Sequence, residues 1–205
     1  MRAIWATAIG AALLVSTTIA AQGSGAVTPK RHVNASKPAK APVAATPAAT
    51  VAPSAPVDSG TTVNEFMSYD PAAKTVALKL FAAHGSVNGG MNFNGASNGG
   101  ATITVPVGWT VSWMFKNEDA IPHSAIILAN KMPFPAQPQD PAIPRAYTKD
   151  VTGGIPTDGT DQTTFKASPA TQYLLACGVP GHAPGGMWIN FVVSADAKAP
   201  TYTTK

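Results

Sequence analysis

Short runs in which apolar and polar side chains alternate dominate the chain from about residue 62 onward. Residues 101–107 are the clearest case, because Thr alternates there with Ile and Val. A side-chain period of two is typical of a strand with one buried face, and clusters of Gly, Asn and Pro separate the runs. The predicted strands are 75–81, 91–93, 101–107, 110–115, 124–128, 163–166, 173–176 and 188–193. Many short strands in series predict an all-β sandwich.

Two stretches fit the strand pattern less well. Residues 71–83 could be helical in part, although no stretch has a convincing helical period with caps. Residues 131–161 contain six prolines and few aliphatic side chains, so we expect a long irregular excursion there. This excursion could cover an edge strand or offer a docking surface to a partner. Asn88-Gly-Gly and Asn98-Gly-Gly are turn signals on either side of Met91.

The first 21 residues have the pattern of an export signal. Arg2 supplies a positive charge, and residues 4–21 are apolar or small. This pattern predicts cleavage after Ala20 or Ala21. An uncleaved membrane anchor is the alternative, because the apolar run is near the lower limit for spanning a bilayer.

Residues 22–60 read as a linker. They hold six prolines and ten alanines in 39 residues, without an aromatic side chain. Such a segment buries too little apolar surface to offset the entropy of ordering, which predicts a disordered, extended spacer. We therefore place the folded domain at 61–205, after a signal or anchor at 1–21.

The net charge of +4 arises outside the predicted domain. Residues 61–205 contain nine Lys or Arg and nine Asp or Glu, so the domain itself is neutral. The excess comes from Arg2, Lys30, Arg31, Lys37 and Lys40, offset by Asp58. This distribution argues against nucleic-acid binding. A basic tether of this kind could touch an anionic membrane surface.

Residues 177–187 concentrate the chemistry of the chain. They hold its single cysteine, Cys177, together with His182 and Met187, in a loop with four glycines and two prolines. Apolar runs flank the loop on both sides, so it should connect two strands. One cysteine cannot form an internal disulfide, so it is a free thiol, an intermolecular bridge or a metal ligand. A free exposed thiol is a liability in an exported protein, and the loop context favours the ligand. A thiolate, two imidazoles and a weak axial thioether define a blue-copper site.

The second imidazole must come from elsewhere in the chain, and His123 is the best candidate. It follows a proline and opens an apolar strand, so it sits at a strand end that the loop could reach. His84 stands beside a glycine in a turn-like setting and should lie on the surface. His32 falls in the predicted linker. The remaining methionines near the domain, Met67, Met91, Met114 and Met132, are expected to be packing residues.

The loop resembles a known family. Cys177-Gly-Val-Pro-Gly-His-Ala-x-x-Gly-Met-Trp, with His123 upstream, looks like the copper loop of the cupredoxins and is most similar to that of the sulfocyanins and rusticyanins. Asn92-Phe-Asn-Gly and Ser97-Asn-Gly are similar to the Asn-rich segment of sulfocyanins. The resemblance covers roughly 91–193. It implies a Greek-key β-sandwich, one type 1 copper and electron transfer, often from a membrane tether. Many cupredoxins have Asn after the first histidine ligand, whereas this chain has Ser124, as rusticyanin-like proteins do.

These features predict an exported, monomeric electron carrier with copper bound by His123, Cys177, His182 and Met187. An electron should pass through the edge of His182 to a redox partner of the cytochrome or terminal oxidase type. An apolar collar of Pro122, Val179, Pro180, Ala183 and Pro184 should surround that edge. We expect no enzymatic activity, because too few histidines remain for catalytic copper clusters. A periplasmic protein that binds or delivers copper is the alternative, although it would be expected to use open Met, His or Cys clusters.

Overall fold

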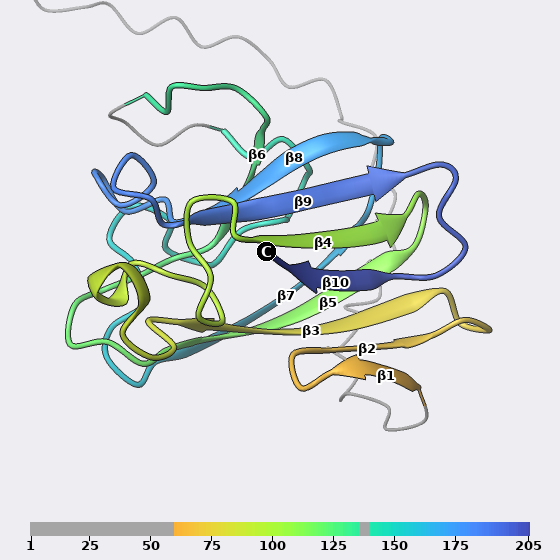
Figure 1. The fold of residues 1–205 in the computed structure, drawn as a ribbon, viewed down its shortest axis with the longest axis horizontal. Helices are drawn as coiled ribbons and strands as arrows, with labels where there is room; N and C mark the ends of the chain where they lie inside the picture. Colours follow the sequence, from red (N-terminus) through yellow and green to blue (C-terminus); the bar gives the residue numbers. More distant parts are fainter. Residues whose placement is uncertain (1–59, 136–139) are drawn as a thin grey trace, which may run out of the picture. The chain divides into compact units, whose positions relative to one another are not determined.

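A computed structural model of the chain describes residues 60–135 and 140–205. Within them, ten strands form two five-stranded sheets (Figure 1). One sheet has the order β1-β2-β3-β5-β7 and the other β10-β4-β9-β8-β6. The strands are β1 (Thr61–Asn64), β2 (Met67–Asp70), β3 (Thr75–Ala82), β4 (Ala101–Pro106), β5 (Thr110–Asn117), β6 (Ile126–Ala129), β7 (Thr160–Lys166), β8 (Thr171–Ala176), β9 (Trp188–Ser194) and β10 (Thr201–Thr204).

The predicted β-sandwich is therefore confirmed. Neighbouring strands run antiparallel except for β3 with β5 and β4 with β9, which are parallel. Strands β3, β4, β5 and β9 show alternate burial along most of their length, as the apolar pattern requires. The predicted signal and nearly all of the predicted linker lie outside the described residues. In the described part of the chain, no helix is long and apolar enough to cross a membrane.

Aromatic side chains join the two sheets across the core. Trp113 of β5 and Phe165 of β7 meet edge to face, with ring centroids 5.2 Å apart. Phe165 lies 6.1 Å from Phe191 of β9, which belongs to the other sheet. Both Trp113 and Phe191 are fully buried. This packing holds one sheet against the other and fixes the strand ends from which the loops leave.

Three features of the secondary structure differ from what the sequence suggested. The helix that residues 71–83 could have formed in part is absent, because the predicted strand 75–81 forms as β3, with alternating burial. Residues 91–93 are not a strand; a 3-10 turn, η1 (Val87–Gly90), precedes them, and only Phe93 makes isolated bridges. Strands β1, β2 and β10 were missed, because each has only four residues and at most one of the four is buried. Both Asn-Gly-Gly turns are present, with Asn88 and Asn98 at a φ of 52°.

The irregular excursion covers the open edge of β6. Covering an edge strand is one of the two roles that the sequence left open. It ends where β7 begins, at Thr160. The Ile127 N–H donates to Ala146 at 2.9 Å, and the Ile127 carbonyl accepts from Ala142 at 2.8 Å. Farther along, the Thr148 N–H donates to the carbonyl of Ala125 at 2.9 Å. The excursion therefore supplies hydrogen-bond partners to the edge backbone of β6, as a sixth strand of the sheet would.

Candidate metal centre

Two segments bring the predicted donors to one end of the sandwich. Strands β8 and β9 pair in antiparallel register from Thr171 with Val193 to Ala176 with Trp188. Cys177 follows the last pair, and its N–H donates to the carbonyl of Met187 at 3.0 Å. The loop between them carries His182 at its turn. The pairing of the two strands thus closes the loop at both ends.

His123 reaches the same place from the segment just before β6. Its backbone exchanges two hydrogen bonds with Ile155 of the excursion, at 3.2 and 2.6 Å. The imidazole is completely buried, as is Asn117 at the end of β5. The excursion therefore fixes the backbone that presents His123, in addition to covering β6.

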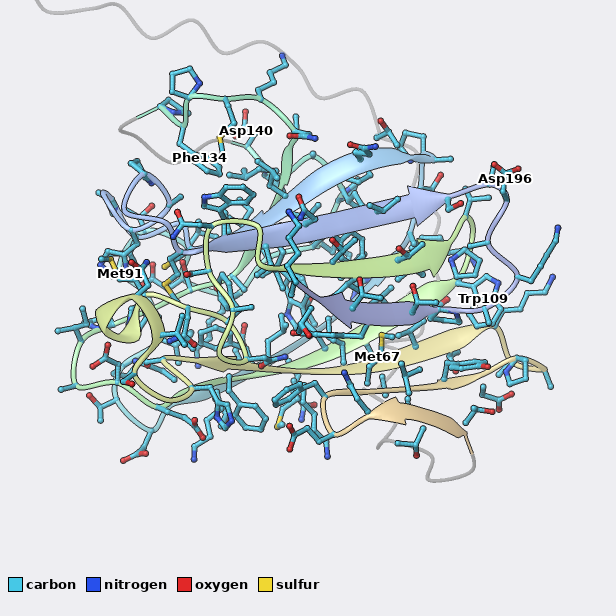
Figure 2. The ribbon with its side chains drawn as sticks, in the orientation of Figure 1. Met67, Met91, Trp109, Phe134, Asp140 and Asp196 are labelled. Carbon is cyan, nitrogen blue, oxygen red and sulfur yellow. The ribbon has the colours of Figure 1, made fainter. Side chains whose placement is uncertain are left out.

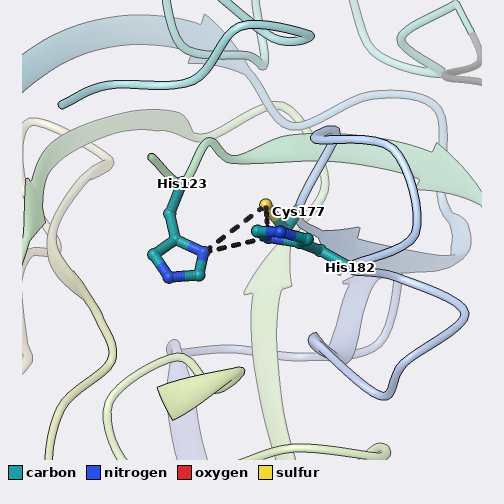
Figure 3. Close-up of side chains that lie close together, drawn as sticks. All are labelled: His123, Cys177 and His182. Carbon is teal, nitrogen blue, oxygen red and sulfur yellow. Dashed lines mark hydrogen bonds between the residues drawn. The ribbon is translucent and has the colours of Figure 1, made fainter. Parts of the chain in front are cut away.

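The three donors converge tightly (Figure 3). His123 Nδ1 lies 3.1 Å from His182 Nδ1 and 3.9 Å from Cys177 Sγ. Cys177 Sγ lies 3.5 Å from His182 Nδ1. Among the described residues, this is the one group of His, Cys, Asp or Glu donors assembled closely enough to hold a metal ion.

These spacings fit a transition-metal ion. Bonds of about 2.0 Å to nitrogen and 2.3 Å to sulfur hold ligand atoms roughly 3.3–3.8 Å apart around a shared ion. The observed separations of 3.1–3.9 Å lie close to that range. Two imidazoles and one thiolate, of which His123 and Cys177 are buried, are the donor set of copper electron-transfer sites. The residues present therefore suit copper.

The thiol of Cys177 is poorly suited to ionise without a metal. Burial raises its pKa above the ordinary value of 9.0, although the N–H groups of Ser124 and Val179 act in the opposite direction. The Ser124 N–H points at Cys177 Sγ from 3.3 Å. Because a metal ligand must be a thiolate, metal binding must displace the thiol proton.

His182 is the more accessible of the two imidazoles. It is half-buried, whereas His123 is completely buried. Burial lowers the pKa of His182 below 6.5, the neighbouring His123 lowers it further, and Asp119 opposes the shift. A neutral imidazole offers its lone pair to a metal, so both effects favour the ligand form.

Ser124 braces the two ligand segments against each other. Its hydroxyl accepts a hydrogen bond from the Gly178 N–H at 2.9 Å and donates to the Val151 carbonyl at 2.7 Å. Ser124 therefore connects the His123 segment with both the cysteine loop and the excursion. The departure from Asn at this position leaves the two ligand loops joined through a hydroxyl group.

A third segment holds the cysteine loop from outside. Asn88 donates through Nδ2 to the Gly185 carbonyl at 2.9 Å, and the Asn98 N–H donates to the Gly186 carbonyl at 2.8 Å. Met91 is labelled at this end of the molecule in Figure 2, and its sulfur packs close to Gly185. The Asn-rich segment of the sequence resemblance thus contacts the loop that carries the donors.

The other residues that the sequence singled out differ in how deeply the structure buries them. His84 is exposed and pairs with Glu118 at 2.9 Å, as expected of a surface residue. Met187 is completely buried at the end of the loop. Met132 is 52% exposed, so its prediction as a packing residue was wrong. Ala183 cannot belong to an exposed collar, because it is buried beside Ile126.

Sequence reasoning missed Asp119. Its Oδ2 atom lies 2.9 Å from His123 Nε2, on the side of the ring that faces away from Cys177. This contact holds the pKa of Asp119 below its usual 3.8, against a smaller effect of burial. The four-residue spacing to His123 was visible, but a carboxylate beside a turn gives no signal by itself. It takes the folded turn to bring the two side chains together.

Comparison with known proteins identifies the family. Residues 62–204 match the Sulfocyanin (SoxE) domain. The chain is 33% identical over 143 residues to sulfocyanin of Sulfolobus acidocaldarius, an alignment that covers 64% of this chain and 70% of the relative. A crystal structure of variant rusticyanin is similar with a TM-score of 0.50 and 26% identity, covering 66% of this chain and 86% of that one. Reduced rusticyanin is 27% identical with a TM-score of 0.49, covering 67% and 89%. Since the family match spans nearly the whole sandwich and the converging donors suit copper, the chain belongs to the sulfocyanin family of cupredoxins, blue copper proteins that carry electrons with one type 1 copper ion.

Proposed function

We propose that His123, Cys177 and His182 are the equatorial ligands of the copper ion, with Met187 as a weak axial ligand. The ion supplies a one-electron couple between Cu(I) and Cu(II). The protein chain supplies a fixed donor set that need not rearrange when the charge changes. This arrangement suits an electron carrier in a respiratory or other redox chain.

The convergence of the two Nδ1 atoms at 3.1 Å carries this proposal. One Nδ1 atom could donate to the other, but Cys177 Sγ also faces both of them, at 3.5 and 3.9 Å, and a shared cation can accept a lone pair from all three atoms. The thiol beside them adds the soft ligand that selects copper. The bracing by Ser124 and Asn88 supports a site held rigid in both oxidation states.

Electron exchange should pass through His182. This imidazole is the half-buried member of the set. Pro180 and Pro184 flank it in the chain, Pro122 precedes His123, and all three prolines are exposed. Ile121, 47% exposed, adds apolar surface beside His123 that the predicted collar did not include. We propose that a redox protein of the cytochrome or terminal oxidase type docks on this surface.

Delivery of copper is the second candidate function. A delivery protein must release its ion to a partner, which favours open and mobile donors. The completely buried His123 and the nearly buried Cys177 argue for retention instead. Electron transfer is therefore the preferred function, and the protein would act as a carrier rather than as an enzyme.

The N-terminal residues bear on location. We propose an export signal or anchor at 1–21, a linker at 22–60 and the copper domain at 61–205. The protein would act outside the cytoplasm as a monomer, in the periplasm or its equivalent. The apolar run of residues 4–21 and the Ala- and Pro-rich linker support this proposal.

Purification with copper tests the proposed ligands. The oxidised protein should be intensely blue and show a reversible one-electron titration. Cys177→Ser should abolish the colour while the far-ultraviolet spectrum of the sandwich stays unchanged, because the absorption requires the thiolate. His123→Ala should bleach the protein, and His84→Ala is the matched histidine control. Bleaching by the His84 change alone would disprove the ligand assignment.

A further inference from the structure

The carboxylate of Asp119 lies directly behind the buried imidazole of His123. The Asp119 Oδ2 atom is 2.9 Å from His123 Nε2, while Nδ1 of the same ring faces Cys177 and His182. An ionised carboxylate can only accept hydrogen bonds, so Nε2 must carry the proton. The lone pair then stays on Nδ1, on the side of the other donors.

The turn that holds Asp119 is built by a buried amide. Asn117 is completely buried, and its Oδ1 accepts from the Asp119 N–H at 2.9 Å. Its Nδ2 donates to the Ile121 carbonyl at 2.8 Å and to the Ile155 carbonyl at 3.0 Å. Asp119 also accepts through Oδ1 from the Ala120 N–H at 2.7 Å. Each of these bonds restricts where the carboxylate can point.

A glycine leaves room for the same carboxylate. A Cβ atom on Gly90 would lie 2.9 Å from Asp119 Oδ2, closer than side chains normally approach. Gly90 also adopts a φ of 93°, where other residues are strained. The 3-10 turn η1 thus passes close to the carboxylate without displacing it.

We propose that Asp119 is a positioning residue for the copper site and lowers its reduction potential. The proposal rests on His123 being a ligand, as argued above. By accepting the Nε2 proton, Asp119 fixes the tautomer and the ring orientation of His123. Its negative charge makes the imidazole a stronger donor, which favours Cu(II) over Cu(I).

Removing the charge tests the proposal. Asp119→Asn keeps the shape and should weaken Cu(II) binding about 10-fold more than Cu(I) binding, which corresponds to a rise of about 59 mV in potential. Glu118→Gln is the matched control, because Glu118 bonds His84 instead of a proposed ligand and is similarly exposed. An equal rise in both variants, or no rise with Asp119→Asn, would overturn the proposal.

A second pair of variants moves the carboxylate without changing its charge. Gly90→Ala crowds Asp119 Oδ2 and should also raise the potential. Gly89→Ala places the same side chain at a φ of 63° with no atom within 4 Å of the new Cβ, so it controls for backbone strain. If Gly89→Ala shifts the potential as far as Gly90→Ala, the effect is strain and the positioning role is refuted.

Nitrogen-15 NMR of the metal-free protein separates this proposal from the ligand assignment. His123 should show a protonated Nε2 in the wild type and a mixture of tautomers in Asp119→Ala. Wild-type protein that binds no copper, but shows this tautomer change, would refute the proposed function and leave the Asp119–His123 contact intact. Blue wild-type protein with the same His123 tautomer in both forms would refute only the role of Asp119.

Discussion

The Ser124 hydroxyl accepts a hydrogen bond from the Gly178 N–H at 2.9 Å, across 54 residues of sequence. The two residues each follow a proposed copper ligand, His123 and Cys177. One hydroxyl therefore connects the two segments that carry these ligands.

Replacing Ser124 with Ala should lower the free energy of unfolding and speed the release of copper. The buried Gly178 N–H would lose its acceptor, which costs about 1–3 kcal/mol of unfolding free energy. Urea unfolding measures this loss, and transfer of copper to a chelator should be faster. Ser86→Ala is the control, because Ser86 makes no capping hydrogen bond with its side chain and should change stability by less than about 0.5 kcal/mol. Equal stability of the two variants would contradict the bracing role.

Substituting Met187 should shift the reduction potential in opposite directions. A thioether is a weak donor and stabilises Cu(II) little, so Met187→Leu should raise the potential. Met187→Gln supplies a harder oxygen and should lower it. A change of about 59 mV corresponds to roughly 1.4 kcal/mol, which a redox titration resolves. If Met187 is only a core residue, both variants lose stability while their copper sites keep the wild-type potential.

The metal-free protein should be most stable between about pH 6.5 and pH 9. Burial lowers the pKa of His182 below 6.5, so on acidification the unfolded chain takes up this proton first and stability falls. Burial raises the pKa of Cys177 above 9.0, so on alkalinisation the unfolded chain loses this proton first and stability falls again. Urea unfolding across the pH range measures both limbs.

Cys177→Ser provides the control for the alkaline limb. Burial also raises the pKa values of Tyr173 and Tyr202 above 10.0, so some loss of stability remains at still higher pH. The variant should therefore begin to lose stability nearer pH 10 than pH 9. An unchanged alkaline limb in Cys177→Ser would show that the thiol does not contribute.

A chain that starts at Gly60 should retain copper, colour and potential. The first strand, β1, pairs with β2 from Thr61 onward. Limited proteolysis of the full chain should cut within residues 22–59 and leave the same core fragment. Loss of copper from the shortened chain would place part of the predicted linker within the fold.

The cysteine loop could be predicted because its donors are close in sequence. Cys177, His182 and Met187 fall within eleven residues between two apolar runs, so their spacing alone indicates a shared site. His123 was recognisable because it precedes an apolar strand. Local sequence carries this information whenever the backbone between the donors is short.

The supports of the site could not be predicted in the same way. Asp119 reaches His123 only because the buried amide of Asn117 shapes the turn between them. Asn88 meets Gly185 across 97 residues, a separation that no local pattern reveals. The edges of the sheets were missed for a related reason, because four-residue strands such as β1 and β10 acquire their structure from pairing partners.

The cover over β6 has a consequence for the protein in concentrated solution. An open edge strand with apolar faces can pair with the same edge of a second molecule and start aggregation. Ile126, Ile127 and Leu128 of β6 are all buried, so this strand would be a strong template if its backbone were free. The hydrogen bonds from residues 142–148 occupy that backbone. The excursion that fixes His123 therefore also keeps neighbouring molecules from pairing along the β6 edge.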